Sequence, residues 1–447
     1  MKRLNKFWKS LHLNCQTLSK KYTNMDPIEG DFFSVHSIVS ILLSVNLFFI
    51  IFTVRIKGKT KLQLYFRNYI CIMIERMALK VGFSFMYNMF EVLVFCLLTV
   101  IISFILTPLI KKVALKVNAI DKPGERRVNV KPMPTLGGLA IYLSFYFSLF
   151  FMQAVPFKQV LPLFIASTVI IITGMIDDLI EITPKMKLLG ITIGALIIYY
   201  VADIRMDLVT LPLIGEIKLG VFSLPITLLW ILAITNAVNL IDGLDGLATG
   251  VSMIALTTMG IIGFFFLTID DVAVPIMIFT LVAAATGFLP YNFFPARIFL
   301  GDTGALFLGF MISVMSLQGL KNATLITVII PVVILGIPIT DTIAAILRRR
   351  LNRKPISSAD KMHLHHRLMT LGLTHRQTVL AIYSIAAMFS LIALMYPLSN
   401  VIGSIMLTIG LLFGLELFME LIGLVSEERR PLLSRLKRFA NRLNRKR

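Results

Sequence analysis

The sequence predicts an all-α polytopic membrane protein with about eleven transmembrane helices between residues 88 and 424. Hydrophobic residues make up 57% of the chain, charged residues only 15%, and the mean hydropathy is +0.84. A water-soluble protein of 447 residues needs more polar surface than this composition can supply. Apolar runs of about 17–25 residues recur along the chain, and each can cross a hydrocarbon layer of about 30 Å as a helix.

The apolar runs and the charges between them predict both the spans and their orientation. The spans lie near 88–110, 136–157, 159–176, 187–203, 222–240, 247–267, 273–290, 305–319, 324–346, 377–396 and 400–424. One set of loops, with the C-terminal tail, carries 27 Lys and Arg residues, and the opposite loops carry 4. Cytoplasmic loops are rich in Lys and Arg, so the first set is expected to be cytoplasmic. This accounts for the net charge of +20 without a nucleic-acid partner.

The two ends of the chain differ from this pattern. Residues 1–87 form an N-terminal extension of doubtful role, with an apolar run near 32–54 that is long enough to span. Seven basic residues follow this run and would lie outside if it spans, against the charge rule. We therefore expect the working protein to start near Met86 or Met89, the alternative being that the run does not span. Residues 425–447 are a basic cytoplasmic tail, either solvated or lying on anionic lipid.

Five polar clusters interrupt the apolar pattern, and the predicted topology places all of them on the cytoplasmic side. They are 121–127 with Lys131 and Gly137-Gly138, Asp177-Asp178 with Lys185, 236–246, 301–304 and 360–367. Ionisable residues at a membrane are costly and so indicate function. A transporter would place them near the midplane, where this chain is overwhelmingly apolar. The clusters therefore predict an active site at the cytoplasmic interface, which a structural scaffold would not need.

The residue types in these clusters suit phosphoryl transfer. The carboxylates and the amides of Asn236 and Asn239 are hard oxygen ligands, which favour Mg²⁺, with Mn²⁺ as the alternative. The basic residues can neutralise a diphosphate. The three cysteines have no metal-site spacing, and the HxHH pattern at 363–366 does not keep zinc ligands on one helix face.

Each cluster also has a plain structural interpretation. Asp177-Asp178 could be a solvated helix end, Asp242 and Asp245 could cap a helix, and Gly301-Asp302 could form an ordinary turn. Five such coincidences on one membrane face are improbable together. The combination therefore favours a catalytic site over five separate structural features.

The motifs, in their order, resemble the polyprenyl-phosphate N-acetylhexosamine-1-phosphate transferase family over residues 89–425. They are DKPGERR (121–127), KPMPTLGG (131–138), GMIDDL (174–179), NAVNLIDGLDGLA (236–248), FLGDTGALFLG (299–309) and ADKMHLHHRL (359–368). The ending HLHHRL is similar to the branch that uses UDP-N-acetylglucosamine. A CDP-alcohol type transferase does not fit, because Asp242-Gly243 lacks the AR and later acids of that motif.

This resemblance implies transfer of N-acetylglucosamine 1-phosphate from UDP-N-acetylglucosamine to undecaprenyl phosphate, with release of UMP. Within the branch, the chain most resembles Gram-positive enzymes that begin the linkage unit of wall teichoic acid, a lipid-linked cell-wall polymer. The implied location is the bacterial cell membrane, with the site in the cytoplasm and membrane lipids as partners. The oligomeric state is left open between monomer and homodimer.

The resemblance also implies a role for each site residue. Asp302 would bind Mg²⁺ on the diphosphate, Asp177 would take the proton of the prenyl phosphate, and Asp178 would stand beside it as a second catalytic acid. The substrate-binding residues would be Lys131, Lys185, Asn239, Asp242, Asp245, His363, His365, His366 and Arg367. The chain departs from the family at Asn129 and Thr135, where members of this branch usually carry His and Arg.

Overall fold

The computed structural model describes the helical part of the chain. The described residues are 89–122, 132–152, 155–211, 215–266, 273–319, 325–351, 353, 362–424 and 434. The chain divides into two compact units, Met1–Cys71 and Ile72–Arg447, and every described residue belongs to the second. The expected N-terminal extension at 1–87, with its apolar run at 32–54, lies outside the described residues, as does the basic tail apart from residue 434.

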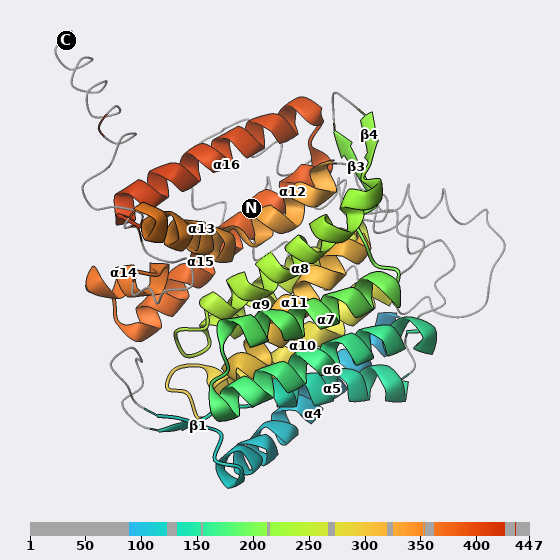
Figure 1. The fold of residues 1–447 in the computed structure, drawn as a ribbon, viewed down its shortest axis with the longest axis vertical. Helices are drawn as coiled ribbons and strands as arrows, with labels where there is room; N and C mark the ends of the chain where they lie inside the picture. The colour runs from blue at the N-terminus through green and yellow to red at the C-terminus, as the bar shows by residue number, and fades with distance from the viewer. Residues whose placement is uncertain are drawn as a thin grey trace, which may run out of the picture. The chain divides into compact units, whose positions relative to one another are not determined.

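The described part is almost entirely helical, as predicted (Figure 1). Its helices are α4 (Met89–Lys116), α5 (Gly137–Met152), α6 (Phe157–Ile180), α7 (Pro184–Tyr200), α8 (Ser223–Leu240), α9 (Leu247–Phe265), α10 (Ala273–Asn292), α11 (Gly301–Gly319), α12 (Leu325–Ile334), α13 (Gly336–Leu351), α14 (Leu364–Thr370), α15 (His375–Met395) and α16 (Val401–Ile422). Short 3₁₀ turns at Gly220–Phe222 and Tyr396–Leu398 adjoin α8 and α15.

Two short antiparallel strand pairs are the only sheets in the described ranges. Strand β1 (Ile120–Asp121) pairs with β2 (Met133–Pro134), with Asp121 opposite Met133. Strands β3 (Leu208–Leu211) and β4 (Gly215–Lys218) form a hairpin in which Leu208 faces Lys218. The first pair lies at the end of the bundle where α14 is found, and the hairpin lies toward the other end (Figure 1).

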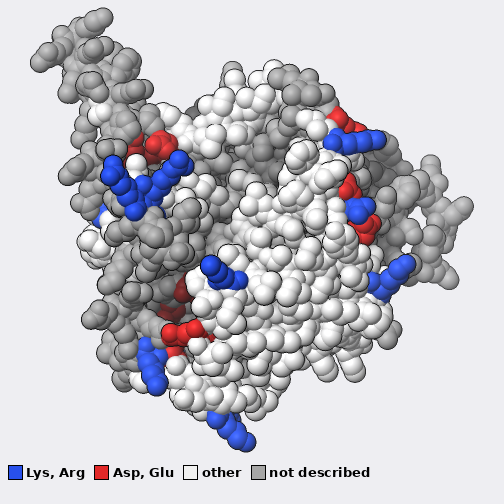
Figure 2. All heavy atoms as spheres, viewed as in Figure 1, with Lys and Arg blue, Asp and Glu red and all other residues white. Residues whose placement is uncertain are grey.

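Seven described helices are long and apolar enough to cross a membrane, so the chain is a multi-pass α-helical membrane protein. They are α4, α6, α8 with its preceding turn, α9, α10, α15 and α16. On the face seen in Figure 2, the described charged side chains gather toward the ends of the helices and leave an uncharged expanse between them. Such an expanse suits contact with hydrocarbon, where charged side chains are costly.

The expected total of eleven spans is not confirmed. Helices α5 and α7 have only 16 and 17 residues, and α11 starts with the polar sequence Gly301-Asp302-Thr303. The single span expected at 324–346 is two helices, because α12 ends at Ile334 and α13 begins at Gly336. Pro338 falls in the first turn of α13, where a missing N–H is tolerated. That segment also contains the buried Asp341, an ionisable residue that the sequence interpretation overlooked.

Helix α11 forms the centre of the bundle and positions the site. Every residue from Thr303 to Leu317 is buried. The helix packs against α5, α6, α8 and α9. The polar N-terminus of α11 therefore emerges among the ends of its neighbours, at the end of the bundle that carries the polar clusters.

Candidate active site

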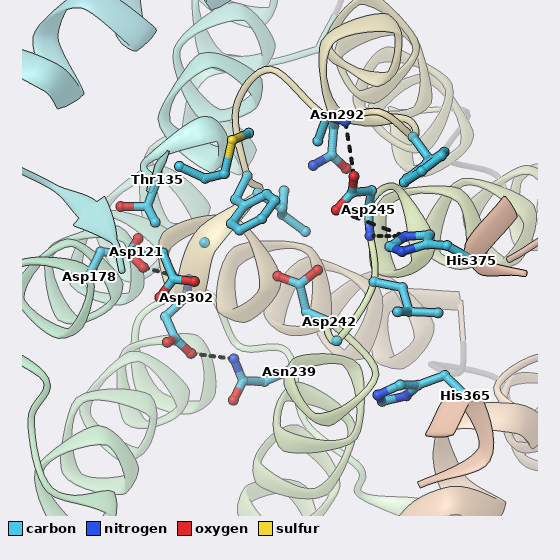
Figure 3. A pocket seen from close by; sticks show the side chains of 18 of the residues that line it. Asp121, Thr135, Asp178, Asn239, Asp242, Asp245, Asn292, Asp302, His365 and His375 are labelled. Carbon is cyan, nitrogen blue, oxygen red and sulfur yellow. Dashed lines mark hydrogen bonds and ion pairs between the residues drawn. The ribbon is translucent and has the colours of Figure 1, made fainter. Parts of the chain in front are cut away.

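A cavity of about 640 Å³ lies at the N-terminus of α11 and is lined by residues of all five polar clusters (Figure 3). Its polar and charged lining residues are Asp121, Thr135, Asp178, Lys187, Asn239, Asp242, Asp245, Asn292, Asp302, His365, His366 and His375. They come from segments spread over some 250 positions of the sequence, with four carboxylates among them besides Asp302. Cavities of this size that collect several ionisable groups are typical of ligand sites.

Asp178 binds the first turn of α11. Its carboxylate accepts the backbone N–H groups of Asp302 at 2.9 Å and of Thr303 at 3.1 Å, and the Thr303 hydroxyl at 2.6 Å. The turn before the helix requires Gly301, which has φ +73° and whose missing Cβ would lie 2.5 Å from the Asp178 carboxylate. A carboxylate at a helix N-terminus stabilises the unpaired N–H groups there. Asp178 thereby holds the backbone from which Asp302 projects.

Lys187 connects the other two acids of this region. Its ammonium nitrogen lies 2.6 Å from Oδ2 of Asp177 and 2.9 Å from Oδ1 of Asp302. Asn239 also donates its side-chain amide to Oδ1 of Asp302. Asp177 is buried, does not line the cavity, and accepts the N–H of Ile182 at 2.9 Å beyond the end of α6. The contacts of Lys187 and Asn239 with Asp302 are both made to Oδ1.

Asp242 is different, because its carboxylate forms no hydrogen bond or ion pair with any described residue. It lies in the loop between α8 and α9 and points into the middle of the cavity (Figure 3). Burial raises the pKa of Asp242 well above its usual value, and the nearby charges of Asp302, Asp178 and Asp245 raise it further. An acid in this position gains either from a bound cation or from a proton.

Asp245 is held by the opposite wall of the cavity. Its Oδ2 accepts the N–H of Ala296 at 2.9 Å, and its own N–H donates to Nε2 of His375 at 3.1 Å. Because Nε2 accepts this bond, it carries no proton there. The His375 ring stacks on Phe294, with 4.5 Å between centroids and 27° between planes. This wall combines aromatic faces with fixed polar groups, as an organic ligand requires.

The histidine segment contributes to the cavity only in part. His365 and His366 line it, and the His365 ring lies so close to Gly243 that a Cβ there would come within 2.4 Å of Nε2. Burial lowers the pKa of His365 to about 3, with the neighbouring His366 as the next cause, so its ring is neutral at physiological pH. His363 and Arg367 are not among the lining residues, and both are buried.

Two expected residues remain, Lys131 and Lys185. Lys131 lies outside the described residues. Lys185 is exposed and does not line the cavity, so the structure does not bring it to the site. The cavity instead contains Lys187, which the sequence interpretation missed.

A sequence signal could have separated the two lysines. Thr183 caps α7 and Pro184 starts it, so Lys185 and Lys187 are two helical positions apart and point in roughly opposite directions. Lys187 shares a face with the small residues Gly190 and Gly194, both buried against the bundle. Asn292, also missed, stands alone in apolar sequence, and His375 lies outside every motif, so neither carries a comparable signal.

Comparisons with known proteins identify the family of the chain. A profile of glycosyl transferase family 4 matches residues 160–320. A Bacillus subtilis (strain 168) protein, described as a probable undecaprenyl-phosphate N-acetylglucosaminyl 1-phosphate transferase, is 40% identical over 357 residues, which cover 79% of this chain and 99% of that protein. The chain belongs to glycosyl transferase family 4. It is therefore a membrane-bound phosphotransferase of that family, as the motifs predicted.

Two further relatives are named for different sugar groups. A decaprenyl-phosphate N-acetylglucosaminephosphotransferase of Mycobacterium leprae is 33% identical over 63% of this chain and 78% of its own length. A phospho-N-acetylmuramoyl-pentapeptide-transferase of Clostridium beijerinckii is 30% identical over 66% of this chain and 92% of its own length. Family membership alone therefore does not choose between the two sugar donors.

Proposed function

We propose that the protein transfers N-acetylglucosamine 1-phosphate from UDP-N-acetylglucosamine to undecaprenyl phosphate. The observation that carries this proposal is the 40% identity to the Bacillus subtilis relative over 99% of that protein's length. The relatives named for N-acetylglucosamine are also more similar to this chain than those named for the muramoyl-pentapeptide. The products are undecaprenyl-diphospho-N-acetylglucosamine and UMP.

In this reaction a phosphate oxygen of the lipid attacks the phosphorus that carries the sugar. The bond from that phosphorus to the oxygen bridging toward the uridine breaks, and UMP leaves with the bond's electron pair. The protein's task is to position two anions and to neutralise their charge. Lys187, which is held between Asp177 and Asp302, provides a cation at the edge of the cavity for this purpose.

The donor set of the cavity fits Mg²⁺, with Mn²⁺ as an alternative. Asp302 would hold the ion through Oδ2, and the ion would supply charge neutralisation on the diphosphate. Within the described residues, no three His, Cys, Asp or Glu side chains converge into a ready-made metal site. That arrangement suits an ion which uses one or two carboxylates and completes its shell with substrate oxygens, as Mg²⁺ does.

The geometry favours Asp242 over Asp177 as the group that accepts the acceptor's proton. Asp177, to which the motifs assigned this role, is engaged by Lys187 and the N–H of Ile182 and does not reach the cavity. Asp242 is free of partners among the described residues and points into the cavity. A base must lie within hydrogen-bond reach of the proton it takes, and of these two acids only Asp242 lines the cavity.

The remaining lining residues would bind the donor. Asn239 keeps Asp302 in place, while Asp245, His365 and His366 present fixed polar groups on the walls. The excess of Lys and Arg in the loops at this end supports a cytoplasmic site in the bacterial cell membrane. The motif resemblance supports use of the product as the first intermediate of a teichoic acid linkage unit.

The test is a side-by-side assay of two donors. Detergent-purified protein is mixed with undecaprenyl phosphate and Mg²⁺, and UMP release is followed with UDP-N-acetylglucosamine or with UDP-N-acetylmuramoyl-pentapeptide. We expect release with the first donor only, and only when the lipid is present. Comparable release with the pentapeptide donor would overturn the donor assignment, and release without lipid would overturn the transfer itself.

A further inference from the structure

The segment His363–Arg367 presents its polar side chains on two sides. His365 and His366 face the cavity, whereas His363 and Arg367 are buried behind it, 6% and 8% exposed. Arg367 donates from Nη2 to the carbonyl oxygen of Ile422 at 3.1 Å, near the end of α16. A cation at a helix C-terminus is favourable, so this contact ties the segment to α16.

The other end of the segment is bound by Asp341, on α13. This carboxylate is 1% exposed, and both of its oxygens are used. Oδ1 accepts the N–H of Leu364 at 2.9 Å, and Oδ2 lies 2.9 Å from Nδ1 of His363. A carboxylate buried in a helix of a membrane protein is retained only where its partners compensate for its desolvation. Asp341 therefore binds the first turn of α14, where His363 is the N-cap residue and its own side chain caps nothing.

The contact between Asp341 and His363 is linked to the cavity by a row of histidine rings. The ring of His363 is parallel to that of His365, with 5.9 Å between centroids and 3° between planes. His365 in turn packs on His366, at 4.2 Å, and against Gly243. Gly243 directly follows Asp242 in the chain and lies two residues before Asp245. A shift of His363 would move the neutral imidazole of His365 relative to the loop that carries both acids.

We propose that Asp341 is a positioning residue for donor binding, and that His363 acts through Nδ1 on Asp341 and not through Nε2 on the substrate. The pair holds α14 so that His365 and His366 face the donor in the cavity. The inference rests on the proposed function, since it concerns how the same site binds its donor. It assigns Asp341 a part in the reaction although that residue lies outside the cavity.

Two substitutions at His363 separate the two roles of the ring. The amide nitrogen of Asn occupies nearly the position of Nδ1, and that of Gln nearly the position of Nε2. We expect His363→Asn to keep kcat/KM within about threefold of the wild type. We expect His363→Gln and Asp341→Asn to raise the donor KM by about tenfold or more, as the loss of an orienting contact typically does.

The comparison needs two internal standards. Thr342→Val is the matched control, because Thr342 neighbours Asp341 on α13 and its hydroxyl donates only within that helix, to the carbonyl of Pro338. It should leave both substrates' KM values unchanged. The donor KM of the double variant Asp341→Asn with His363→Gln should be no higher than that of the single variants, because both substitutions break the same contact. The KM for undecaprenyl phosphate should stay constant throughout.

Several results would overturn the inference. These are a better tolerance of Gln than of Asn at His363, additive losses in the double variant, or variants that lower only the thermal midpoint and leave donor kinetics unchanged. If Asp341→Asn does not fold, the Asn and Gln variants of His363 decide alone. If the wild type releases no UMP, the proposed function fails. The variants are then ranked by the UDP-N-acetylglucosamine concentration that gives half-maximal thermal stabilisation, which tests the inference separately.

Discussion

The carboxylate of Asp178 accepts the backbone N–H of Asp302 at a distance of 2.9 Å. Together with its two bonds to Thr303, this contact makes Asp178 the cap of α11 and directs Asp302 into the cavity. The two adjacent acids at the end of α6 therefore have different tasks. Asp178 holds a helix, while Asp177 holds a cation, since it pairs with Lys187.

Asp178→Asn should impair both folding and activity. One acceptor oxygen becomes an NH₂ group that faces donors, so at least one buried N–H or hydroxyl loses its partner, at a cost of about 1–3 kcal/mol. We expect a lower thermal midpoint, a reduced kcat and an unchanged shape of the pH–rate profile. Thermal unfolding and pH-dependent kinetics measure these quantities, and a normal midpoint combined with a lost acidic limb would make Asp178 a base instead.

Asp242→Asn should remove the acidic limb of the pH–rate profile. The raised pKa of Asp242 means that this carboxyl is protonated at low pH, so kcat/KM of the wild type should rise with pH as it ionises. Loss of a general base typically costs about 10²–10⁴-fold. Asp177→Asn should lower activity with the acidic limb retained. Loss of that limb in the Asp177 variant alone would return the role of base to Asp177.

Lys187→Met should reduce turnover strongly, whereas Lys185→Met should not. Without Lys187, the carboxylates of Asp177 and Asp302 lose the cation they share, and like charges at such distances repel. We expect at least about a hundredfold loss, the lower end of the effects of removing a charged catalytic contact. Lys185 is the matched control, since it is exposed on the other side of the same helix. Equal losses in the two variants, measured as UMP release, would contradict the positions seen here.

His365→Gln should raise the donor KM without changing the pH–rate profile between about pH 6 and 8. The pKa of His365 is lowered to about 3, so the ring is neutral throughout this range. The lowered pKa also makes the folding stability depend on pH. An unfolded histidine takes up its proton near pH 6.5 and the folded one only near 3, so the wild type loses stability as the pH falls through this window. The variant should therefore lose less thermal stability between pH 7.5 and 5.5, and an equal loss would show that His365 is protonated in the folded protein.

The sequence predicted the helical membrane fold and the convergence of distant polar segments, for a clear physical reason. Long apolar runs can form few structures in a bilayer, and the uneven distribution of Lys and Arg between the loops indicates on which side each helix end lies. The number of spans was harder to predict. Helix α11 is surrounded by protein, so it does not present an apolar face to lipid. Helices α12 and α13 share one apolar run, so each is shorter than a single span.

Roles within the site depended on contacts that spacing does not contain. The adjacent acids Asp177 and Asp178 have different partners, and only the packing of α6 on α11 shows which of them meets Thr303. Arg367 looked like a donor contact because it follows the histidines, yet it binds the carbonyl of Ile422, some 55 residues later. Asp341 was overlooked because it stands alone in an apolar segment.

Transfer of a phosphosugar in this cavity is proposed to depend on a metal held by Asp302. Its most direct test is UMP release from UDP-N-acetylglucosamine and undecaprenyl phosphate by the wild type and by Asp302→Asn, each over a range of Mg²⁺ concentrations and after EDTA treatment. Turnover of the wild type should vanish on metal removal and return with Mg²⁺. Turnover of the variant should be about 10³-fold lower at every concentration, a loss of about 4 kcal/mol of transition-state stabilisation. Full activity of the EDTA-treated wild type, or more than about a tenth of its turnover in a folded Asp302→Asn variant, a difference of only about 1.4 kcal/mol, would contradict the account.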